Sequence, residues 1–334
     1  MEKSKKLIDL YLLVLFLLGA ISLILRTIAC CIEWNDITKH FNDDAVITIA
    51  NILAVASIGL FATYPLLVKN NEKIASSDTP HSYIPAGMLA VALLFSSFEK
   101  LAERNNPLIS ANATLVALAL VTFLLGVASA AFFFLTVFVE KNESVWKAIF
   151  GMTLVAFCAI SAAYLYFDNT ILPTNSPAKI ANMMAYLFAS MFFLFETRIA
   201  LGRSIWPAYV TFGLSATLIT AYASVPTLIY YVVSGTCISG SLYECALLLT
   251  ISIFICARVV LTRKLHSEGA CDAVKCIEMI AAKREIELNG DDALLACIHE
   301  VNNEVDNIEE IEAEEFENYT MDLPLPESNE EEND

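Results

Sequence analysis

The chain has 334 residues, of which 57% are hydrophobic and only 17% charged, yet its formal net charge is −17. This composition excludes a collagenous chain, a disulfide-rich mini-domain and a nucleic-acid binder that works through a basic patch. Residues 1–262 hold 15 basic and 15 acidic residues, whereas residues 263–334 hold 5 basic and 22 acidic. The chain therefore consists of a neutral, very apolar body and an acidic tail.

Eight segments of the body are long and apolar enough to cross a membrane, which takes about 20 such residues in a helix. Lipid offers no hydrogen bonds to the backbone, so each segment is expected to be helical. The segments are residues 8–31, 45–68, 83–101, 109–139, 145–167, 179–201, 205–233 and 242–262. The sequence predicts an all-α integral membrane protein, with a polytopic transmembrane domain over residues 1–264 and the lipid bilayer as its surroundings.

The basic residues between the segments predict the orientation. Twelve lie on the side of the N-terminus and five on the other side, and cytoplasmic loops are the ones enriched in Lys and Arg. The five are Arg26, Lys39, Lys100, Arg104 and Lys179. We therefore expect a multi-pass protein of the plasma (cytoplasmic) membrane with both termini in the cytoplasm.

The acidic tail is predicted to be a separate module. Residues 265–317 are predicted to form an amphipathic helical hairpin, with helices near 268–288 and 292–316, and residues 318–334 a disordered acidic end. Apolar side chains spaced by four and three residues line the second helix, as in a short heptad stripe: Leu294, Ile298, Val301, Val305 and Ile308. The stripe is either a docking face for a cytosolic protein or a second copy, or the inside of a self-contained hairpin. The acidity of the tail disfavours nucleic acid as a binding partner.

Charged residues close the sixth segment at its cytoplasmic end. Glu196 and Arg203 are seven residues apart and so share a helix face, with Arg198 between them. Ionisable groups in membrane segments are expensive and often functional. The alternative is that the arginines only mark the cytoplasmic helix end.

Arg26 stands deeper in apolar sequence, near the outer end of the first segment. Its candidate partners on that side are Glu33, Asp36 and Glu244, and the alternative is that its side chain extends to the outer headgroups.

Glu99 ends the third segment much as Glu196 ends the sixth, a hint of an inverted repeat of spans 3–5 and 6–8. Acidic residues lie near segment ends rather than at mid-span, which argues weakly against a proton-coupled carboxylate relay.

Nine cysteines are present. Cys30, Cys31 and Cys237 map to the outer side, where a disulfide between the first segment and the seventh loop is possible if that side is oxidising. In the tail, the residues Cys271, Cys276, Cys297 and His299 form a weak candidate metal set whose spacing matches no familiar zinc module, and buried thiols are the default interpretation. No cofactor is expected.

The sequence leaves two functions open. The span count, the charge-poor interior and the hint of a repeat favour a permease or channel-like carrier for a small solute. The tail favours a non-catalytic membrane anchor or regulator that recruits a cytosolic partner. No Walker loop, H-E-x-x-H or G-x-S-x-G motif occurs, so the sequence leans against an enzyme.

Overall fold

The computed structural model describes residues 2–42, 45–68, 83–138, 145–170, 172–173, 175–200, 206–238 and 241–268. The chain divides into two units, Met1–Cys271 and Asp272–Asp334, and the whole second unit lies outside the described residues. The predicted stripe of the tail and the metal candidates Cys271, Cys276, Cys297 and His299 lie outside them too, so these stay predictions.

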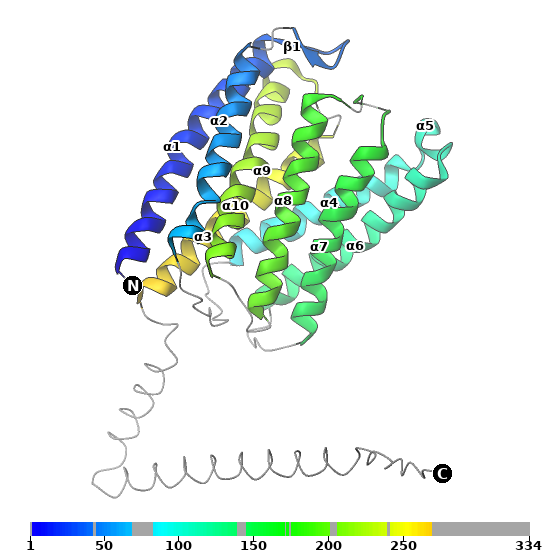
Figure 1. The fold of residues 1–334 in the computed structure, drawn as a ribbon. Coiled ribbons are helices and arrows are strands. Elements are labelled where there is room, and N and C mark those ends of the chain that lie inside the picture. Colours follow the sequence, from blue (N-terminus) through cyan, green and yellow to red (C-terminus); the bar gives the residue numbers. More distant parts are fainter. Residues whose placement is uncertain are drawn as a thin grey trace, which may run out of the picture. The chain divides into compact units, whose positions relative to one another are not determined.

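Within the described part, eight helices are long and apolar enough to cross a membrane, as predicted (Figure 1). They are α1 (Glu2–Ile32), α2 (Ala45–Phe61), α4 (Tyr83–Glu103), α6 (Ala113–Phe138), α7 (Val145–Phe167), α8 (Pro177–Ala200), α9 (Trp206–Ser234) and α10 (Leu242–Glu268). The short helix α3 (Tyr64–Leu67) follows α2. The protein is an all-α, multi-span membrane protein.

The outward faces of these helices are apolar. On α1, the side chains of Leu10, Phe16 and Ile24 are all more than half exposed. Rows of exposed large apolar side chains are unfavourable in water and are what a lipid-facing helix presents. The exposed faces therefore agree with a membrane setting for the bundle.

The fourth long helix begins later than the sequence suggested, at Ala113 rather than near residue 109. Asn106 accepts a hydrogen bond from the Leu108 amide and caps the short helix α5 (Pro107–Ser110). The Asn112 side chain then accepts the Thr114 amide over 3.1 Å. Asparagine is a strong N-cap, so Asn112 starts a new helix at a point where hydropathy alone predicts one continuous segment.

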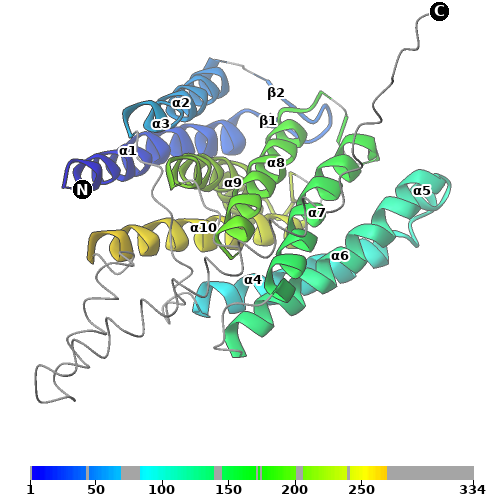
Figure 2. The same cartoon turned by 60° about the horizontal axis from the view of Figure 1, so that its bottom comes forward.

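Six of the long helices form a closed ring. In the order α4, α6, α7, α8, α9, α10, each helix packs on the next, and α10 packs back on α4 (Figure 2). Helix α9 has the largest buried share of the eight and also packs against α1, which in turn packs on α2. The ring corresponds to the third to eighth predicted spans, and α1 and α2 lie outside it.

A small β-hairpin, which was not predicted, lies at one end of the bundle. Strands β1 (Trp34–Asn35) and β2 (His40–Phe41) pair antiparallel, and the rings of Trp34 and Phe41 meet edge to face at 5.2 Å. The Ser176 hydroxyl donates to the Lys39 carbonyl over 3.1 Å, which ties the hairpin to the start of α8. We call this end of the bundle the hairpin end; α10 begins and α4 and α7 finish at the same end.

Candidate functional site

The ring contains a group of charged side chains near the hairpin end, which we call the acidic cluster: Glu99, Lys100 and Glu103 of α4 and Glu244 of α10. Lys100 lies at its centre. The Lys100 ammonium is 3.0 Å from Glu103 Oε2 and 4.0 Å from Glu244 Oε2, and it lies 4.6 Å from the centre of the Tyr164 ring. The side chains of α4, α7 and α10 therefore converge on one ammonium group.

Hydrogen bonds from neutral side chains hold two of the carboxylates in place. The Tyr164 hydroxyl of α7 donates to Glu103 Oε2 over 2.9 Å. The Ser241 hydroxyl, just before α10, donates to Glu99 Oε2 over 2.5 Å. Ser241 also accepts the backbone amide of Glu244 over 3.0 Å and so caps α10. The start of α10 is thereby fixed against the end of α4.

Glu244 differs from the other two carboxylates. Its residue is only 2% exposed, and its Oε1 atom has no hydrogen-bond partner. The Ser241-x-x-Glu244 spacing is that of a capping box, in which the glutamate side chain returns to the cap's own amide. In the structure the Glu244 carboxylate instead lies beside Lys100. A purely capping role therefore does not account for this buried carboxylate.

The interior of the ring is consequently not charge-poor at the hairpin end. Lys100 is 7% exposed and Glu244 2%. An ion taken from water into the interior loses several kcal/mol of hydration, which a single ion pair replaces only in part. The sequence placed both residues near segment ends, and the packing of α4 against α10 buries them.

A second charged group lies at the other end of the ring. Arg258 of α10 donates to Glu196 Oε1 through Nε at 2.9 Å and through Nη2 at 2.5 Å. The Tyr209 hydroxyl of α9 donates to Glu196 Oε2 over 2.9 Å. The ring of Trp206 stacks on that of Tyr209 with centroids 6.2 Å apart. This group, which we call the Glu196 triad (Glu196, Tyr209 and Arg258), joins α8, α9 and α10.

The sequence pattern pointed to Glu196 but not to its partners. Arg203 lies outside the described residues, and Arg198 rests with its guanidinium 5.9 Å from the Phe195 ring. Spacing within one helix shows only which residues share a face, so it pointed to Arg203. Arg258 is one of the twelve basic residues on the side of the N-terminus, and nothing local in the sequence links it to a residue 62 positions away.

Aromatic side chains fill the ring between the two charged groups. Phe133, Phe193 and Phe254 come from α6, α8 and α10, and the Phe254 centroid is 5.2 Å from that of Phe133 and 6.0 Å from that of Phe193. Along α10, Glu244 and Arg258 are 14 residues apart, which is roughly 21 Å of helix, and Phe254 lies between them. An apolar layer thus separates two polar ends of the same ring.

Arg26 is buried outside the ring. It is 2% exposed, and its guanidinium lies 4.2 Å from the centre of the Tyr222 ring. Of its candidate partners, Glu33, Asp36 and Glu244, none is within ion-pair distance of Arg26 in the described structure. The side chain therefore does not reach the surface; it gains a cation–π contact with Tyr222 and hydrogen bonds with the Tyr222 and Cys30 side chains.

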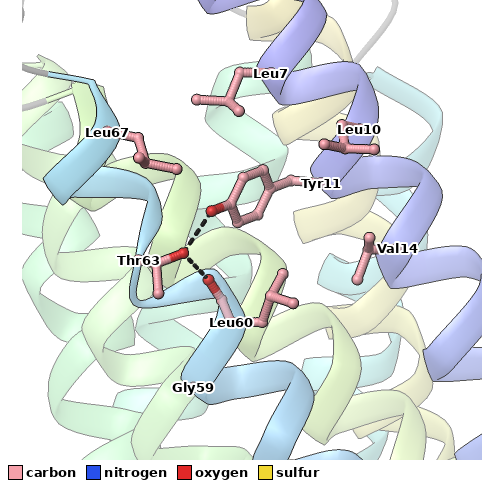
Figure 3. Close-up of a pocket in the computed structure, with 8 residues that line it drawn as sticks. All are labelled: Leu7, Leu10, Tyr11, Val14, Gly59, Leu60, Thr63 and Leu67. Atoms are coloured by element: carbon pink, nitrogen blue, oxygen red, sulfur yellow. Dashed lines mark hydrogen bonds between the residues drawn. The ribbon is translucent and has the colours of Figure 1, made fainter.

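An apolar pocket of about 500 Å³ lies between α1 and the α2–α3 pair (Figure 3). Its polar feature is a 2.5 Å hydrogen bond between the hydroxyls of Tyr11 and Thr63. The lining is Leu7, Leu10, Tyr11, Val14, Gly59, Leu60, Thr63 and Leu67. Without a charged side chain and outside the ring, this pocket does not suit a polar solute.

Cysteine and metal chemistry find no support in the described part of the chain. No disulfide joins Cys237 to Cys30 or Cys31 there. No group of three His, Cys, Asp or Glu side chains in those residues could hold a metal ion. The contacts recorded within the acidic cluster come from Lys100 and from the Tyr164 and Ser241 hydroxyls.

No family model, no curated protein and no solved structure matches this chain.

Proposed function

We propose that the protein is a carrier for a small solute, with the path through the six-helix ring. The observation that carries the proposal is the burial of Glu244 and Lys100 inside the ring. Charged groups within membrane helices are costly and are retained mainly where they bind or move something. An anchor for the tail does not require charged groups inside the ring.

The arrangement along the ring supports the same function. The acidic cluster lies toward one end, the Glu196 triad toward the other, and the aromatic layer between them. A carrier needs a polar site that is closed from at least one side of the membrane, and packed aromatic side chains provide such a closure. Under the orientation inferred from the basic residues, with both termini in the cytoplasm, the acidic cluster faces the outer side.

Recruitment of a cytosolic protein or a second copy through the tail is the alternative function. It rests on the sequence of residues 265–317 alone, because the predicted docking face lies outside the described residues. The contacts of the ring do not bear on it, so the carrier is the function that the geometry favours.

Reconstitution of the purified full-length protein into liposomes tests the proposal. Uptake is measured for a panel of labelled amino acids, sugars and nucleosides, in the wild type and in Glu244→Gln. The matched control is Asp9→Asn, which makes the same chemical change at an exposed position of α1 outside the ring. We expect uptake of at least one solute class, a loss of tenfold or more in Glu244→Gln and unchanged uptake in Asp9→Asn. No uptake in any class, or equal uptake in both variants, would contradict the proposal.

A further inference from the structure

Glu244 combines deep burial with incomplete pairing. One of its oxygens, Oε2, is 4.0 Å from the Lys100 ammonium, and the other, Oε1, has no hydrogen-bond partner. A buried carboxylate usually accepts several hydrogen bonds that replace its lost hydration. The ionised form of Glu244 is therefore poorly stabilised in this position.

The surrounding charges do not remove the deficit. Three carboxylates of the cluster share one ammonium, and Lys100 lies nearer to Glu103, at 3.0 Å, than to Glu244. The groups that face Glu244 from the packed elements are acidic or neutral apart from Lys100: Glu99 and Glu103 of α4, Tyr164 of α7, Tyr186 of α8 and Cys237 of the segment before α10. The cluster thus lacks positive charge, and Glu244 is its most deeply buried carboxylate and the one whose Oε1 has no hydrogen-bond donor.

A metal ion is a poor candidate for the missing charge. The described residues contain no group of three His, Cys, Asp or Glu side chains arranged to hold one. The Lys100 ammonium already occupies the space between Glu103 and Glu244. A proton needs no coordination shell, and it neutralises the carboxylate on the oxygen that has no partner.

We propose that Glu244 is a proton-binding site, at which a proton replaces the Lys100 ammonium as the partner of the carboxylate. The proton adds to Oε1 and converts the carboxylate to a neutral carboxylic acid, and no other bond is formed or broken. This inference rests on the proposed carrier function, in which the proton would be the coupling ion.

Proton binding at Glu244 has a defined structural consequence. The Lys100–Glu244 pair joins α4 to α10, the contact at which the ring closes. When Glu244 is neutral, Lys100 keeps its closer partner Glu103, and the electrostatic attraction between α4 and α10 is reduced. The proton therefore weakens one particular helix contact of the ring.

The test uses the purified full-length protein in nanodiscs and does not depend on transport. Infrared difference spectra are recorded between alkaline and acidic buffer, and the carbonyl stretching band of a protonated carboxylic acid is followed. The chain has 37 Asp and Glu residues, so the Glu244 band is the component that is present in the wild type and in Asp9→Asn and absent from Glu244→Gln. We expect this component to titrate. Lys100→Met should move its midpoint upward by one pH unit or more, because the cation that favours the ionised form is gone.

A second measurement needs no variant and covers the case in which the variants do not fold. Dicyclohexylcarbodiimide reacts with protonated carboxyl groups in apolar surroundings, and peptide mass spectrometry locates the adduct. We expect adduct formation on Glu244 that rises several-fold as the pH is lowered. Identical carbonyl bands in the wild type and in Glu244→Gln, or an adduct that is absent from Glu244 at every pH, would overturn the proton site. A Glu244 adduct that is suppressed by sodium but not by high pH would overturn it in favour of a metal cation.

The two proposals fail separately. If Glu244 titrates but no solute crosses the membrane, the proton site stands and the carrier function is wrong. If a solute crosses while neither the band nor the adduct maps to Glu244, the carrier stands and the proton site is wrong.

Discussion

Arg258 on α10 binds Glu196 on α8 through two hydrogen bonds to one carboxylate oxygen, and the pair spans the position of α9, which packs between these two helices. The second carboxylate oxygen accepts from Tyr209 on α9 itself. Three consecutive helices of the ring are therefore joined at one carboxylate. Both charged side chains are largely buried, with 15% of Arg258 and 18% of Glu196 exposed.

We expect Arg258→Met to lower the free energy of unfolding by about 1–3 kcal/mol, because it leaves a largely buried carboxylate with one remaining donor. The free energy is measured by unfolding in mixed detergent micelles. The control is Arg198→Met, which removes an arginine that contacts only the Phe195 ring in the described structure and should change it by less than about 0.5 kcal/mol. Equal losses in both variants would show that the loss in Arg258→Met does not come from the pairing of Arg258 with Glu196.

Two buried cations outside the acidic cluster should respond in opposite ways to the same substitution. Lys179 donates to the Asp168 carbonyl and to Asn169 Oδ1, both over 2.7 Å, so Lys179→Met should cost about 1–3 kcal/mol of stability. Arg26 instead contacts the Tyr222 side chain and the Cys30 thiol, and no carboxylate pairs with it in the described structure. A buried charge without a counter-charge retains most of its desolvation cost, so an apolar replacement removes that cost.

We therefore expect Arg26→Met to leave the midpoint of thermal unfolding unchanged or to raise it, while Lys179→Met lowers it by several degrees. Unfolding is followed by circular dichroism in detergent. A drop in Arg26→Met as large as that in Lys179→Met would mean that Arg26 has an anionic partner in solution, and the interpretation of an uncompensated cation would be wrong.

Hydropathy predicted the number of membrane helices and most of their ends, because burial of apolar residues in lipid depends on local composition. It could not predict which charged residues share a site. Lys100 is one of the five basic residues on its side, and its burial depends on the packing of α10, whose Glu244 is 144 residues away, against α4. The β-hairpin could not be predicted from the sequence, because its strands have two residues each and are too short to show an alternating pattern.

Close helix packing in the ring depends on Gly126 of α6. A Cβ atom at this position would lie 1.9 Å from the Ser97 hydroxyl of α4 and 3.1 Å from the Phe157 ring of α7. We expect Gly126→Ala to lower the free energy of unfolding by about 1–3 kcal/mol, because the Ser97 side chain and the Phe157 ring must shift to admit the methyl group. The matched control is Gly87→Ala on α4, where a Cβ would meet nothing within 4 Å. That change should be neutral or stabilising by up to about 1 kcal/mol. An equal loss in both variants would show that the loss in Gly126→Ala does not come from the close contact between helices.

Asp36 in the hairpin gives a pH dependence outside the membrane spans. Burial works against its ionised form, but hydrogen bonds from Tyr230, Trp34 and Thr236 and the nearby Lys39 outweigh it and lower the pKa of Asp36. Tyr230 donates to Oδ2 over 2.9 Å and Trp34 to Oδ1 over 3.1 Å. A carboxyl group with a lowered pKa in the folded state binds its proton more readily when unfolded, so its stabilising contribution is complete above the unfolded pKa of about 3.9.

That contribution is lost as the pH falls from this value through the lower folded pKa. We therefore expect Asp36→Asn to be less stable than the wild type at pH 6, and the difference between them to shrink steadily below about pH 4. Thermal unfolding of both proteins between pH 3 and pH 6 measures this. A difference that stays constant over the whole range would mean that Asp36 stabilises the hairpin through hydrogen bonds that asparagine cannot make, and not through its charge.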